Sequence, residues 1–106
     1  MHELEPILGY LGKKGERAMS LKFISYDLND PGQEYETLID AIKSYGTYCK
    51  INKSDWLVNT SDSCGNIRDY LKKFIDTNDT LFVAELTGAW GSWNLRQKAV
   101  DWLKGQ

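Results

Sequence analysis

Apolar and polar positions form two kinds of block along residues 21–104. Four short runs, rich in apolar and β-branched side chains, are typical of strands: residues 21–26, 47–51, 55–60 and 80–86. The first run is apolar on both of its faces and the last is nearly so. Strands of that kind lie inside a sheet with both faces covered.

Helical spacing is clearest in the stretch that follows the first strand. Its apolar positions are Tyr35, Leu38, Ile39, Ile42 and Tyr45. Asp30 is a good N-cap, Pro31 suits the first helical position, and Gln33 occupies the capping-box position. We therefore expect this helix to begin after Asp30 and to end near Gly46.

Two further stretches have the same helical spacing. The second helix should bury Ile67, Tyr70, Leu71, Phe74 and Ile75, after several possible caps in residues 61–66. The third should bury Leu95, Ala99, Trp102 and Leu103. Asn94 is its expected N-cap, with Gln97 at the capping-box position.

The resulting order is β-α-β-β-α-β followed by a helix, which predicts an α+β ferredoxin-like sandwich. Right-handed crossovers give an antiparallel sheet of order 4-1-3-2 with the first two helices on one face. The other face also carries apolar side chains and must be covered by the C-terminal helix, by a second protomer, or by both. We therefore expect a homodimer.

Residues 1–18 differ from the rest of the chain. Leu4, Ile7, Leu8 and Leu11 have helical spacing, but the glycines and lysines of residues 12–15 interrupt it. We interpret residues 1–18 as an N-terminal tail, with a short docking helix as the alternative. Residues 19–106 then form one ferredoxin-like domain.

Composition is that of an ordinary globular protein, with 42% apolar and 26% charged residues. The apolar runs are too short to span a bilayer, and no basic leader with a long apolar stretch opens the chain, so we expect a cytoplasmic protein. The net charge of −2 argues mildly against nucleic acid as a partner. Cys49 and Cys64 lack metal-type spacing and should be reduced thiols.

The chain has a single histidine, His2, and this excludes a catalytic triad based on histidine. The topology brings four acidic residues toward one rim of the sheet: Asp27, Asp30, Asp55 and Asp79. Carboxylate oxygens are ligands that Mg²⁺ prefers. Helix capping and turn formation explain the other three, so only Asp27 is a candidate catalytic residue and metal ligand. A dimer could supply its second copy.

Trp90 and Trp93, in the glycine-rich residues 87–93, are candidate partner-binding residues. The alternative, which we favour at this point, is that the tryptophan rings pin the last helix onto the domain. Arg68, Lys72 and Lys73 form a modest basic group that could contact nucleic-acid phosphates. A solvated helix face explains these three residues equally well.

Several motifs resemble those of a family of small bacterial proteins labelled SinR-like. They are S-Y-D-L-N at residues 25–29, P-G-Q at 31–33, W-L-V at 56–58 and D-W-L-K at 101–104, and the resemblance covers most of residues 21–104. More distantly, the first strand ending in Tyr26-Asp27 resembles the CRISPR-associated ferredoxin-like endoribonuclease and integration-scaffold family. That resemblance implies a homodimer, Mg²⁺-dependent nuclease action through Asp27, or duplex DNA binding as a scaffold.

Three hypotheses follow. The first is a homodimeric, non-enzymatic binding or scaffold domain, with nucleic acid as one candidate partner. The second is a Mg²⁺-dependent ribonuclease in which two copies of Asp27 face each other across a dimer axis. The third is a protein-interaction module that uses Trp90 and Trp93.

Overall fold

The computed structural model describes residues 18–30 and 35–106. Within these residues the elements follow the predicted order. The strands are β1 (Ser20–Asp27), β2 (Tyr48–Asn52), β3 (Asp55–Thr60) and β4 (Thr80–Leu86). The helices are α1 (Glu36–Lys43), α2 (Cys64–Leu71) with the 3-10 turn η2 (Lys72–Phe74), and α3 (Gln97–Lys104). The expected bounds of β3 and β4 are confirmed to the residue.

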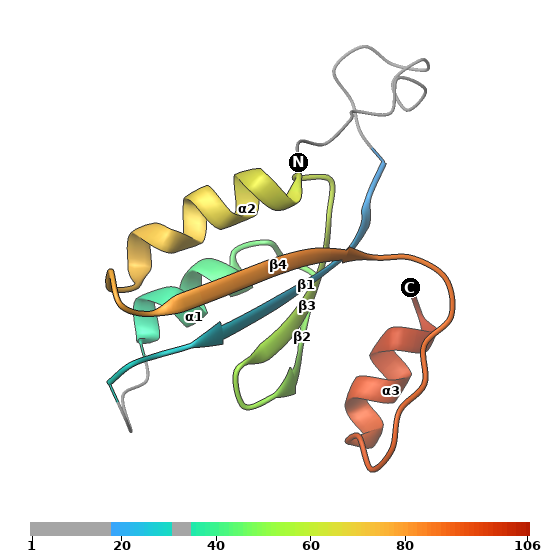
Figure 1. Cartoon of the computed structure of the whole chain (residues 1–106). Helices are drawn as coiled ribbons and strands as arrows, with labels where there is room; N and C mark the ends of the chain where they lie inside the picture. Colours follow the sequence, from blue (N-terminus) through green and yellow to red (C-terminus); the bar gives the residue numbers. More distant parts are fainter. Residues whose placement is uncertain (1–17, 31–34) are drawn as a thin grey trace.

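The four strands form one antiparallel sheet in the order β2-β3-β1-β4, which confirms the ferredoxin-like topology. β1 lies inside the sheet, paired to β3 on one side and to β4 on the other. Figure 1 shows α1 and α2 on one side of the sheet and α3 beyond its other side. We call the side under α1 and α2 the helix face and the opposite side the second face.

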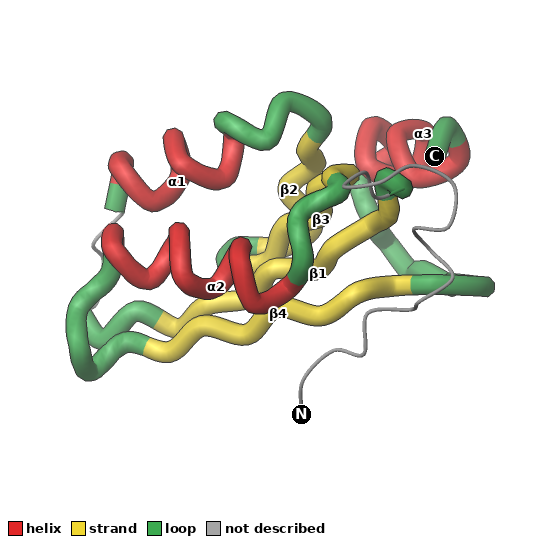
Figure 2. Tube along the Cα trace, turned by 90° about the horizontal axis from the view of Figure 1, so that it is seen from above, coloured by secondary structure: helices red, strands yellow, loops and turns green. Residues whose placement is uncertain are grey.

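The main core lies between the helix face and the two helices that cover it, a layering that Figure 2 shows from above. Its largest fully buried side chains are Ile24, Leu38, Ile42, Val58, Ile67 and Leu71. Trp56 joins them, and its indole Nε1 donates a 3.1 Å hydrogen bond to the Tyr26 hydroxyl. A buried indole that finds an acceptor avoids the free-energy cost of an unmade hydrogen bond.

The predicted start of α1 is wrong. The helix begins at Glu36 with Tyr35 at its N-cap, and no side chain caps it. Pro31 and Gln33, the other two positions of the expected start, lie outside the described residues. By contrast, α2 begins within the expected stretch, where the Ser63 hydroxyl accepts a hydrogen bond from the Asn66 amide.

The predicted cap of the last helix is wrong as well. Asn94 has a φ of +59°, in the left-handed region, and α3 begins only at Gln97. Asparagine tolerates that conformation better than most residues, so Asn94 serves the turn before the helix. The expected buried side of the helix is confirmed at Ala99 and Leu103.

Among residues 18–30 and 35–106, no helix is long and apolar enough to cross a membrane. The expectation of an N-terminal tail concerns residues that, except for Ala18, lie outside the described part of the chain.

Candidate functional site

Within residues 18–30 and 35–106, the second face is covered on one half only. α3 packs against β2, its residues Ala99 and Leu103 are buried, and Leu57 of the neighbouring strand β3 is buried as well. Its end is tied to the same half of the sheet, because the Asn59 side-chain amide donates a 2.8 Å hydrogen bond to the side chain of Gln106. The C-terminal helix thus covers part of the second face, which the sequence predicted to be covered.

The other half of the second face, on β1 and β4, is left open by the residues that the structure describes. Strand register places five apolar side chains there, which we call the open face: Leu21, Phe23, Phe82, Ala84 and Leu86. Phe23 lies directly opposite Ala84, and Leu21 lies directly opposite Leu86. Phe82 is 62% exposed and Leu86 is 39% exposed. A contiguous apolar surface of this kind marks a contact site more often than a lone exposed residue does.

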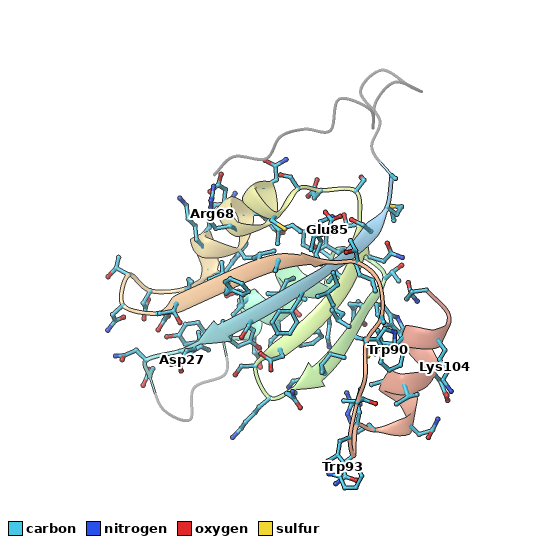
Figure 3. All side chains as sticks on the ribbon, turned by 45° about the vertical axis from the view of Figure 1, so that its right-hand side comes forward. Asp27, Arg68, Glu85, Trp90, Trp93 and Lys104 are labelled. Atoms are coloured by element: carbon cyan, nitrogen blue, oxygen red, sulfur yellow. The ribbon has the colours of Figure 1, made fainter. Side chains whose placement is uncertain are left out.

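Trp90 and Trp93 follow the open face in the chain, on the segment between β4 and α3. Figure 3 shows both side chains on this segment, with Trp93 at its far end from the sheet. Trp93 is 86% exposed and Trp90 is 43% exposed. The expectation that these rings pin the last helix is therefore wrong for Trp93. Exposed tryptophans are costly to leave in water and are enriched where proteins bind partners.

Asp27, the candidate catalytic residue, is exposed at the end of β1, opposite Thr80 of β4. It lies at the opposite end of the sheet from Glu85 (Figure 3). In the part of the chain that the structure describes, no group of three or more histidine, cysteine, aspartate or glutamate side chains is arranged to hold a metal ion.

Asp79, another residue of the predicted acidic rim, has a structural task. Its carboxylate accepts a 2.6 Å hydrogen bond from the Asn29 amide and a 2.7 Å bond from the Asp76 amide. These two amides, the Asn29 amide foremost, hold the pKa of the Asp79 carboxyl below its usual range. Asp79 thus ties the loop after β1 to the turn before β4, a contact that its sequence position alone does not reveal.

The basic group on α2 is largely engaged with a neighbouring acid. Arg68 Nε lies 2.9 Å from the Asp69 carboxylate, and Lys72 Nζ lies 3.6 Å from the same oxygen. Arg68 lowers the pKa of Asp69, as expected for an exposed ion pair. Lys73 instead stands over the ring of Tyr70, 5.2 Å from its centroid. Asp69 thus offsets part of the positive charge of Arg68 and Lys72.

Cys49 and Cys64 are both half-buried, and neither forms a disulfide in the structure. Cys49 lies in β2 and Cys64 is the first residue of α2. Burial raises the pKa of the Cys49 thiol, which disfavours the reactive thiolate.

Lys22 is a polar residue whose position the sequence did not single out. It is 3% exposed, on the helix face of β1. Its ammonium donates to the Ser20 hydroxyl at 2.7 Å and to the Thr60 carbonyl at 3.2 Å, and Glu85 of β4 lies 3.9 Å away. These partners offset the cost of burying the charge.

No protein-family model matches the chain.

Proposed function

We propose that this protein is a homodimeric, non-enzymatic binding domain, a scaffold that acts through protein–protein contact. The contact surface of the proposal is the open face together with Trp90 and Trp93. The exposure of Phe82 on a half-covered sheet face carries the proposal, because a lone chain gains nothing from leaving that ring in water.

A scaffold is better supported than the ribonuclease. The ribonuclease hypothesis rests on Asp27 alone within one chain, and it requires a second copy of Asp27 across a dimer axis. A role in nucleic-acid binding is weakened by the ion pairs that Asp69 makes with Arg68 and Lys72. The open face has no comparable internal partner among the described residues.

Light scattering over a dilution series tests the homodimer. The mass should rise from 12.1 kDa, the mass of one chain, toward twice that value as concentration increases. Phe82→Lys should weaken the dimer at least tenfold, because it places charge on the contact surface. Thr37→Lys, an exposed position on α1, is the matched control and should leave the mass unchanged. A wild-type chain that stays at 12.1 kDa at every concentration contradicts the proposal.

A further inference from the structure

The two edge strands of the sheet differ in how far they are blocked from pairing with another strand. β2 forms one edge, and three features block it. Its pairing with β3 is irregular between Lys50 and Asn52, its carbonyl at Lys50 accepts a hydrogen bond from the Arg96 guanidinium, and it is only five residues long. Bulges, a covered edge and short length are among the devices that stop an edge strand from pairing with another chain.

β4 forms the other edge and has none of these features. Its seven residues pair with β1 without a register shift, and they include neither proline nor lysine. Figures 1 and 2 show β4 at the margin of the sheet. Among residues 18–30 and 35–106, no strand pairs with its outer side.

The hydrogen-bonding phase of β1 identifies which groups β4 offers outward. The Tyr26 amide donates to the Ser54 carbonyl, so Tyr26 and every second residue before it point their backbone groups toward β3. The intervening residues of β1 therefore point toward β4. Their partners on β4 are Leu86, Ala84, Phe82 and Thr80.

The remaining residues of β4 direct both backbone groups away from the sheet. These residues are Leu81, Val83 and Glu85. Their amides and carbonyls form a regular ladder on the free edge, spaced as an antiparallel partner strand requires.

We propose that β4 pairs antiparallel with β4 of a second copy of this chain, about a two-fold axis at Val83. This inference rests on the proposed homodimer and names the strand that joins it. Val83 then faces Val83 of the second copy, and Leu81 faces Glu85. All three residues are the outward ones, so the ladder closes with about six hydrogen bonds.

The side chains of β4 suit this self-pairing. Glu85 is the one charged residue of the strand, and it faces Leu81 of the second copy rather than another Glu85. Within its own chain it lies 3.9 Å from Lys22. Like charges directly opposite each other destabilise a strand pair, and this register avoids them.

Phe82 gains a neighbour in the same register. It faces Ala84 of the second copy, and the two Phe82 rings become diagonal neighbours across the axis, about 7–8 Å apart at the backbone and within reach of aromatic side chains. The exposure of Phe82 in one chain is then relieved by its own copy. The two open faces also join into one apolar strip on an eight-stranded sheet, with an α3 beyond each side.

A matched pair of variants at Glu85 tests the pairing of β4 with β4 of the second copy, which we call the seam. Glu85→Pro removes an outward amide, and it spares the ladder with β1 because proline is tolerated on edge strands. Glu85→Ala removes the same carboxylate but keeps the amide. Light scattering should show dimerisation weakened at least tenfold in Glu85→Pro and little changed in Glu85→Ala. Equal, wild-type dimerisation of both variants overturns the seam.

A disulfide test holds even if the proline variant fails to fold. In the double variant Phe82→Cys/Ala84→Cys, each new thiol faces its partner across a non-hydrogen-bonded pair, about 4.5 Å apart at Cα and within disulfide range. Oxidation should therefore give a covalent dimer on a non-reducing gel. In each single variant the two new thiols are only diagonal neighbours, so no disulfide should form and the protein should run as a monomer on the same gel. Cys49 and Cys64 are present in all three proteins, so they provide a constant background.

The outcomes separate this inference from the proposed function. No cross-link in the double variant, or equal cross-linking in the single variants, overturns the seam. A dimer that survives Glu85→Pro but is lost in Phe82→Lys keeps the homodimer and rejects the β4 pairing. A wild-type chain that is monomeric throughout rejects both.

Discussion

The β2–β3 half and the β1–β4 half of the sheet differ in how far their second face and their edge are covered. On the second face, Leu57 of the first half is buried, whereas Phe82 of the second half is exposed. At the edges, Arg96 caps a carbonyl of β2, whereas no strand among the described residues pairs with the outer side of β4. In the described part of the chain, the exposed sheet face and the unpaired sheet edge thus lie on the same half.

This coincidence indicates one contact region rather than scattered exposure. The helix face is buried over both halves, so the chain has enough apolar residues to form a full core there. The open half is therefore not a failure of folding. It is the half on which we expect a second copy to bind, and each prediction below compares it with the covered half.

The largest difference should come from truncating one apolar side chain on each half. Leu57→Ala empties a site that is 3% exposed under α3, and it should lower the free energy of unfolding by about 2–4 kcal/mol. Phe82→Ala should lower it by no more than about 1 kcal/mol in dilute solution, where the chain is a monomer. Urea denaturation followed by circular dichroism measures both. Equal losses would erase the contrast between the two halves.

A smaller effect should follow from removing the brace at the end of the β1–β4 half. Asp79 has a lowered pKa in the folded chain, so its stabilisation is present above its ordinary pKa of 3.8 and is lost as pH falls through the folded value. Asp79→Asn should therefore lower the melting temperature at pH 7 and flatten its decline below about pH 4. Asp40→Asn, on the exposed side of α1, is the control. An acid decline as steep in Asp79→Asn as in the wild type would show that Asp79 does not brace this end.

The smallest effect on stability should come from Trp93→Ala. The ring is 86% exposed, so its loss should change the free energy of unfolding by no more than about 0.5 kcal/mol. Trp56→Ala, in the core, should cost about 3–5 kcal/mol. Acrylamide quenching of tryptophan fluorescence should fall in Trp93→Ala, since the most accessible indole is gone. Unchanged quenching would mean that Trp93 is covered in solution.

The fold was largely predictable because its strands are short and clearly bounded. The bounds of β3 and β4 followed from apolar runs between polar turns. The helix starts were not predictable from caps. α1 begins beside Tyr35, the first residue of its apolar stripe, and Asn94 takes a left-handed conformation instead of capping α3. Neither helix begins where the local capping signals indicated.

The candidate site was only partly predictable. Apolar residues on both faces of β1 and β4 predicted that the second face of the sheet is covered. They could not show which half of that face α3 would leave open. The brace at Asp79 and the buried Lys22 depend on contacts with residues far away in the sequence, so no local pattern marks them. Trp93 was expected to support the last helix and is instead exposed, because the segment that carries it extends away from the sheet.

Amide hydrogen exchange, measured by NMR at low and high protein concentration, tests the central claim most directly. The outward amides of Leu81, Val83 and Glu85 should exchange quickly in dilute solution and become protected as concentration rises. The amides of Phe82 and Ala84, which point toward β1, should be protected at both concentrations. Fast exchange of the three outward amides at every concentration would contradict the pairing of β4 with a second copy.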